Sequence, residues 1–131
     1  MNRAVAPPAI PVPFANYSHG IEAPPGARLL VTSGQLGSEP GGAVPEGAEA
    51  QARLCFRQIE AILAAAGMGR EDVLRLNAFV TDRAHMAGYM AARDEWLNGL
   101  SPPPASTLVI VAGFTRPEFV VEVEATAAKA G

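Results

Sequence analysis

Residues 51–67 read Q-A-R-L-C-F-R-Q-I-E-A-I-L-A-A-A-G, the longest regular pattern in the sequence. The other predicted elements lie on both sides of it. Across 46–66, apolar residues recur at steps of three and four, which is typical of a helix with one face against a core. The residues of this face are Ala48, Ala52, Cys55, Ile59, Ile62, Leu63 and Ala66. Gly67 and Gly69 end the predicted helix.

Strands are predicted on both sides of this helix. Residues 17–21 are short enough for an edge strand, and 28–34 read R-L-L-V-T-S-G, a compact apolar run with β-branched residues. The glycine-rich segment 37–47 follows as a loop. After the helix, 71–74 is expected to make one helical turn, and the alternation over 76–80 predicts a third strand.

The second half of the chain repeats this pattern. A second helix is predicted over 84–97, with Asp82 as its cap, and strands are predicted over 106–112 and 119–126. The apolar stripe of this helix includes Trp96, and the residues that mark it are Met86, Tyr89, Met90, Arg93, Trp96 and Leu97. The predicted order is β-β-α-β-α-β-β.

This order predicts an α+β fold with both helices on one face of a mixed sheet, because right-handed crossovers return each helix to the same side. The length of 131 residues fits one domain, which we place at 15–131 after a proline-rich N-terminal arm at 1–14. Nothing in so short a chain covers the other sheet face. Since T-L-V-I-V at 107–111 is apolar on both sides, we expect assembly to supply the missing layer.

Charge and composition exclude several functions. The net charge is -3 and the arginines are scattered singly, so no basic stripe exists for nucleic acid. Prolines interrupt the first residues, and no run approaches the roughly 20 apolar residues that span a bilayer. The lone Cys55 cannot form an internal disulfide, so we expect a cytoplasmic protein without a membrane partner.

No cofactor or metal motif is present in the sequence. His19 and His85 are far apart and have no metal-ligand spacing, and Cys55 is best explained by packing on the first helix. The glycines from Gly34 to Gly42 match neither a dinucleotide-binding motif nor a P-loop. We therefore expect a protein that uses neither a metal nor a cofactor.

The last strand carries a pair of carboxylates. Its period of two places Glu122 and Glu124 on one face and Val121, Val123 and Ala125 on the other. A solvated strand face explains this pattern, and so does general acid-base chemistry if assembly desolvates the carboxylates and raises their pKa. The sequence leaves both explanations open.

Several motifs, in this order and spacing, resemble the RidA-like (YjgF-type) family of enamine/imine deaminases. They are Y-S-H-G-I at Tyr17, V-T-S-G-Q at Val31, the helix 51–67, F-V-T-D at Phe79, P-A-S-T-L-V-I-V at Pro104 and V-E-V-E-A-T-A at Val121. The resemblance implies a chorismate-mutase-like fold and a homotrimer with a central β-barrel. It also implies clefts between subunits that bind small molecules and hydrolyse reactive enamines and imines without a cofactor.

The resemblance also identifies site residues. Tyr17 and Ser33 match positions that line the family's cleft, and Glu122 matches the glutamate that positions or activates water. Ser106, however, stands where the family has an arginine that binds the substrate carboxylate through two parallel hydrogen bonds.

Two further departures make the expected cleft less polar: Met90 replaces a common asparagine, and Leu108 replaces a frequent cysteine. Arg116, in the loop before the last strand, is one candidate to reach the cleft instead.

Two functions remain open at this point. One is a divergent hydrolase or deaminase of a small enamine, imine or related metabolite, with Glu122 as its catalytic residue. The other is a trimer that binds a small molecule in the same clefts without chemistry. An endoribonuclease, the older description of relatives, is the least supported because the acidic, dispersed charge offers RNA no footprint.

Overall fold

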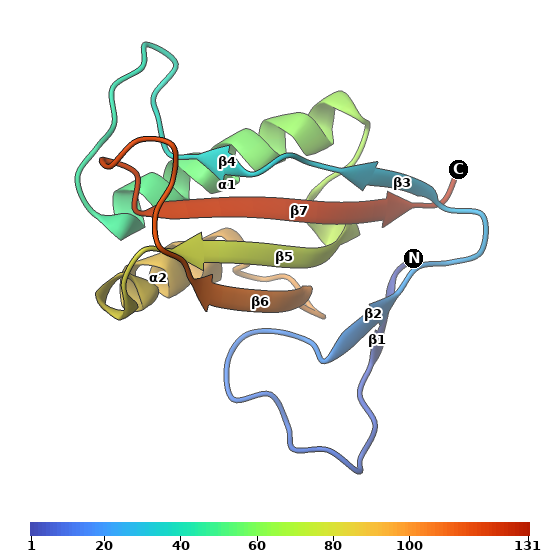
Figure 1. The fold of residues 1–131 in the computed structure, drawn as a ribbon. Helices are drawn as coiled ribbons and strands as arrows, with labels where there is room; N and C mark the ends of the chain where they lie inside the picture. The colour runs from blue at the N-terminus through green and yellow to red at the C-terminus, as the bar shows by residue number, and fades with distance from the viewer.

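The computed structural model describes residues 1–131 and shows one main sheet with two helices on one side of it (Figure 1). The strands of this sheet are β3 (Arg28–Val31), β4 (Gln35–Leu36), β5 (Val73–Val80), β6 (Ala105–Ile110) and β7 (Val121–Lys129). Their order is β3-β7-β5-β6, and β4 pairs with β7 beyond the end of β3. The sheet is mixed, because only the β5–β6 pair is parallel. The predicted α+β class is confirmed.

Both helices pack against the same face of the sheet. They are α1 (Ala48–Ala65) and α2 (Met86–Trp96), and short 3-10 turns at Arg70–Asp72 and Arg83–His85 precede β5 and α2. The core between the layers is apolar and nearly inaccessible to water, with Ala52, Cys55, Phe56, Ile59, Leu63, Leu76, Val80, Tyr89, Val121 and Val123 among its residues. Most of the predicted apolar face of the first helix is therefore buried, whereas its residues Ile62 and Ala66 are only half-buried.

Two predicted strand boundaries differ from the structure because of contacts made far along the chain. The strand expected over 28–34 divides at Thr32, whose backbone N–H donates to the Ala125 carbonyl and whose hydroxyl accepts from the Ala125 N–H, each at 3.0 Å. The strand expected over 119–126 is displaced to β7, because the Val120 N–H donates to the side chain of Gln51 at 2.9 Å. Neither contact is visible in a local pattern.

The N-terminal arm contains a strand that the sequence did not predict. β1 (Arg3–Val5) pairs antiparallel with β2 (Gly20–Glu22) in a small separate sheet. The Asn2 side chain donates to the carbonyls of Asp72 and Ala128 at 3.1 and 3.2 Å, which ties the arm to the end of the main sheet. Residues 6–19 form the long connection between the two strands (Figure 1).

The face of the sheet opposite the helices is open to solvent. Leu29 and Val31 of β3 are 66% and 65% exposed there, and Val109 of β6 is 40% exposed. Exposed aliphatic side chains at both edges of one sheet face are typical of surfaces that contact another subunit. No helix in the structure is both long and apolar enough to cross a membrane.

Candidate functional site

A cavity of about 250 Å³ lies beside β6, between this edge strand, α2 and the connection before β2. Its lining is Phe14, Ala15, Tyr17, Met86, Met90, Arg93, Ser106 and Leu108. The structure thus brings together Tyr17 and Ser106, two of the three predicted substrate-binding residues, whereas Ser33 does not line this cavity. The replacements at Met90 and Leu108 line the same cavity, so its wall is largely apolar, as expected.

The register of β6 determines which side chains reach this cavity. Ser106 pairs with Leu76 and Leu108 pairs with Ala78, and both partners lie in the core beneath the helices. Paired residues on adjacent strands point to the same face, so Ser106 and Leu108 face α2. An arginine at position 106 would project toward α2 in the same way.

Tyr17 is held against the edge of β6 by its neighbours. The Ser18 N–H donates to the Pro104 carbonyl at 3.0 Å, which aligns the segment with the start of β6. The Tyr17 ring makes edge contacts with the rings of Phe14 and His19, with centroids 5.7 and 5.9 Å apart. These contacts fix the side chain at the mouth of the cavity.

A second, more polar cavity of about 230 Å³ shares two of these residues. Tyr17 and Ser106 line it together with Ser18, His19, Arg75, Ala105 and Thr107. Arg75 donates from Nε to Asn77 Oδ1 at 2.8 Å and from Nη2 to Thr107 Oγ1 at 3.0 Å. The Asn77 amide in turn donates to Glu124 Oε2 at 3.4 Å, so a polar network crosses the open sheet face.

Glu122 lies on β7, one strand in from the β4 edge of the sheet, next to Gly34. The residue pairs with Leu36 of β4, and a Cβ atom added to Gly34 would lie only 2.6 Å from Glu122 Cδ. The absence of a side chain at position 34 therefore makes room for the carboxyl group, and Ser33 is adjacent and exposed. Desolvation raises the pKa of Glu122, and the nearby charge of Glu124 adds to this effect.

The predicted site residues therefore form two groups that one chain keeps apart. Tyr17 and Ser106 are at the β6 edge, whereas Ser33 is at the β4 edge and Glu122 is on β7 beside it, with β5 between β7 and β6. Two inter-strand steps, roughly 10 Å, separate β7 from β6, and the Glu122 and Ser106 side chains point to opposite faces of the sheet, so one small ligand does not bridge them directly. Each group is half of a site.

Cys55 does not join either group as a nucleophile. It is buried in the core, where its Sγ donates to the Gln35 carbonyl at 3.1 Å. Burial raises the pKa of the thiol to about 12, and the charge of Glu122 contributes in the same direction. A thiol that stays protonated is a packing residue, as the sequence predicted.

Arg116 lines neither cavity. Its guanidinium pairs with Glu118 at 2.8 Å and lies 4.9 Å from the centre of the Phe119 ring. Both contacts hold it in the loop before β7. Within one chain, Arg116 does not take the place of an arginine at position 106.

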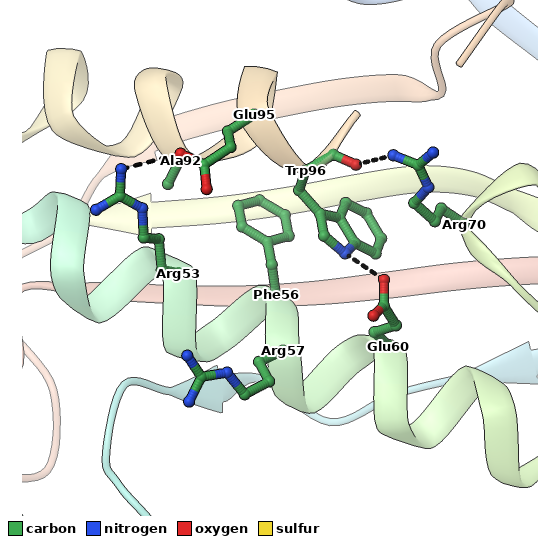
Figure 2. A pocket seen from close by; sticks show the side chains of 8 residues that line it. All are labelled: Arg53, Phe56, Arg57, Glu60, Arg70, Ala92, Glu95 and Trp96. Atoms are coloured by element: carbon green, nitrogen blue, oxygen red, sulfur yellow. Dashed lines mark hydrogen bonds and ion pairs between the residues drawn. The ribbon is translucent and has the colours of Figure 1, made fainter. Parts of the chain in front are cut away.

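The largest cavity, about 380 Å³, lies between α1 and α2 and contains none of the predicted residues (Figure 2). Its polar groups mostly bind one another: Arg53 pairs with Glu49 and Glu95 at 2.7 and 2.9 Å, and Trp96 Nε1 donates to Glu60 at 3.1 Å. Phe56 stacks on Trp96 at a centroid distance of 4.9 Å. The arrangement joins the two helices.

The sequence did not single out Arg93 as a site residue, although it placed this arginine on the second helix's apolar stripe. It is 3% exposed and lies in the cavity with Ser106. The one sequence feature that pointed to its burial is that Arg93 stands among apolar residues on one face of the second helix, four residues after Tyr89. Gln51, which bonds three backbone groups of two loops, gave no signal beyond being polar on a helix.

The fold and its two half-sites define a small α+β protein whose candidate ligand site lies at the edges of one sheet. The chain belongs to the family described as Endoribonuclease L-PSP, whose family model matches residues 8–129. This confirms the resemblance to RidA/YjgF proteins.

Relatives of known name support the same membership. A RutC family protein of Aquifex aeolicus is 30% identical over 82% of this chain and 84% of its own length. The 2-iminobutanoate/2-iminopropanoate deaminase of Salmonella typhimurium is 29% identical over 98% of this chain and 99% of its own.

Solved structures agree with the fold. A Rid family protein of unknown function from Yersinia pestis superposes with a TM-score of 0.83 at 26% identity, covering 98% of both chains. RidA from an Antarctic Psychrobacter bacterium has a TM-score of 0.71 at 30% identity, covering 95% of this chain and 98% of its own.

Proposed function

We propose that the protein is a homotrimer whose clefts, each formed between two subunits, bind a small reactive enamine, imine or related metabolite and hydrolyse or deaminate it. The observation that carries this proposal is the position of Glu122, whose pKa is raised, on β7 beside the β4 edge and away from the Tyr17–Ser106 cavity at the β6 edge. Family membership and relatives named as deaminases support it.

A cyclic assembly would join the two half-sites. In a head-to-tail ring, the β6 edge of one subunit meets the β3–β4 edge of the next, so unlike edges come together at every interface. A two-fold dimer of like edges would instead pair each half-site with its own copy. The exposed Leu29 and Val31 would be covered in the ring, which supplies the apolar area that stable assembly needs.

Glu122 is suited to move a proton in such a cleft. In the proposed reaction it accepts a proton from water while the water oxygen bonds to the imine carbon. The carboxyl group then gives this proton to the nitrogen, which completes a carbinolamine. Glu122 next accepts the proton of the new hydroxyl group and donates it to the nitrogen as the carbon–nitrogen bond breaks, so a ketone and ammonia leave. A carboxylate with a raised pKa is a stronger base toward water than that of an ordinary glutamate. The reaction requires no metal, cofactor, nucleic acid or membrane.

The second candidate function is binding without chemistry, and the specific observation in its favour is Ser106. A serine hydroxyl cannot provide the two parallel charged hydrogen bonds that an arginine gives to a carboxylate. Loss of one partner of a desolvated charge pair costs on the order of 2–5 kcal/mol. A cleft weakened in this way could hold a metabolite that it does not convert.

Imine decay distinguishes the two functions. An enzyme that generates a 2-imino acid is coupled to the full-length protein, and the remaining imine is trapped with semicarbazide and measured by absorbance. The proposed reaction predicts that the wild-type chain accelerates imine loss and that Glu122→Gln leaves it at the uncatalysed rate. A wild-type chain that leaves imine decay at the uncatalysed rate would exclude the deaminase function for that substrate and favour binding alone.

A further inference from the structure

One charged side chain faces the cavity that contains Ser106. Arg93, from α2, is 3% exposed, and it is the only charged residue among the eight that line this cavity. Its surroundings are mainly the apolar side chains of Met86, Met90 and Leu108. A guanidinium in such a place costs free energy unless its N–H groups are well paired.

The pairing within the chain is incomplete. Arg93 donates from Nε and from Nη2 to the same oxygen, Asp94 Oδ1, each at 3.1 Å, and Nη1 makes no hydrogen bond within the chain. The Asp94 side chain is 50% exposed, so solvent competes for its carboxylate. A guanidinium carries five N–H donors in a planar fork. Donors therefore remain for a second anion.

A second polar group in the same region also lacks a partner. The Tyr89 hydroxyl, one turn before Arg93, is fully buried and makes no hydrogen bond within the chain. Burial raises the pKa of Tyr89, while Arg93 and Ser106 act in the opposite direction. The three side chains are thus neighbours, with the Tyr89 ring centre 5.9 Å from Arg93 Cζ. Tyr89 does not line the cavity, so the unpaired guanidinium donors of Arg93, which does line it, are the groups that favour an anionic ligand oxygen.

We infer that Arg93 is the carboxylate anchor of this cavity, and that it performs from α2 the role that an arginine at position 106 would perform from β6. The ligand class is then a small carboxylate with a short apolar substituent that packs against Met86, Met90 and Leu108. This inference rests on the proposed function, because it takes the Ser106 cavity as the substrate cleft. It implies that the cavity still binds a carboxylate through an arginine, which stands on α2 and not at position 106 of β6.

Other nearby arginines are less suited to this role. Arg75 is exposed on the opposite face of the sheet, and its Nε and Nη2 already donate to Asn77 and Thr107. Arg116 is bound to Glu118. Arg93 combines burial with free donors, and desolvation strengthens a charged hydrogen bond.

The test compares two probes of nearly equal shape, 2-oxobutanoate and its neutral amide, 2-oxobutanamide. Binding to the full-length protein is measured by titration calorimetry at neutral pH, so the readout does not depend on turnover. Wild type is expected to bind the carboxylate at least about tenfold more tightly than the amide, and Arg93→Gln to lose that preference. Arg116→Ala, the matched control, is expected to keep it.

A second variant keeps the test decisive if Arg93→Gln does not fold. Asp94→Asn removes the anion that now occupies Nε and Nη2, and its exposed position makes it tolerable to the fold. Carboxylate affinity is expected to rise several-fold in this variant. An unchanged affinity in Asp94→Asn, or no carboxylate preference in wild type, overturns the inference.

The outcome is separable from that of the proposed function. Carboxylate binding that depends on Arg93, without imine hydrolysis, supports the anchor and rejects the enzyme. Imine hydrolysis and carboxylate binding that both survive Arg93→Gln in a folded protein support the enzyme and reject the anchor. In the double variant Arg93→Gln with Ser106→Arg, recovery of the carboxylate preference would show that both positions serve the same cavity.

Discussion

The ionisation of a single carboxyl group sets the expected pH dependence of the protein. Burial and Glu124 raise the pKa of Glu122. An activity that needs its carboxylate form will therefore be lost at a higher pH, as the solution is acidified, than with an ordinary glutamate. Glu124→Gln removes one of the two causes, so the acid limb of the pH–rate profile should move to lower pH. The profile of imine hydrolysis measured from pH 4 to 8 checks this.

The same ionisation has the opposite effect on stability. A raised pKa means that the fold favours the protonated form, so the stability contributed by Glu122 is present below its unfolded pKa and is lost as pH rises through the folded pKa. Glu122→Gln should therefore lower the rate about 100-fold or more while leaving thermal stability at neutral pH equal or higher. If Glu122→Gln lowered both the rate and the thermal stability, Glu122 would be a structural residue.

Gly34 offers a way to move this carboxyl group without changing its chemistry. A methyl group at position 34 would lie 2.6 Å from Glu122 Cδ, and the flexible end of that side chain must shift. Since a displacement of about 1 Å at a reacting group can cost up to about 100-fold, Gly34→Ala should reduce the rate strongly. Gly41→Ala, where nothing lies within 4 Å, is the control, and equal rates in both variants would contradict the role of Glu122.

Between elements, one buried side chain joins α1 to two loops. Gln51 donates from Nε2 to the carbonyls of Pro45 and Glu118, and its Oε1 accepts from the Val120 N–H, each at 2.9 Å. Gln51→Leu leaves these backbone groups unpaired, so we expect a loss of about 2–4 kcal/mol in the free energy of unfolding, measured in urea. Gln58→Leu, which removes one bond to Ser38, should cost about 1 kcal/mol or less.

Elements formed by local patterns were predictable, and elements formed by distant contacts were not. The alternation of Val121 to Ala125 matches their burial, and the period of α1 identifies most of its buried residues but misses Leu54 and Phe56. The pairing of β1 with β2 and the break at Thr32 depend on partners far along the chain. The burial of Arg93 beside Ser106 likewise arises only when α2 packs against β6, which no spacing within the helix reveals.

For the whole molecule, the open sheet face determines whether the two half-sites can meet. If Leu29 and Val31 are covered by a neighbouring subunit, wild type should have a mass three times 13.6 kDa by light scattering. Val31→Lys would bury a charge in that interface at a cost of several kcal/mol, which should release monomers at micromolar concentration.

Imine hydrolysis by Val31→Lys should fall together with the trimer, because a monomer keeps Glu122 on β7 and the Ser106 cavity at the β6 edge apart, on opposite faces of the sheet. Val12→Lys is the matched control, since Val12 is 84% exposed in the connection between β1 and β2 and remote from the sheet face in sequence. It should remain a fully active trimer. A wild-type monomer that hydrolyses imines would contradict the shared cleft, because one chain would then complete the site across two strand spacings, roughly 10 Å of sheet.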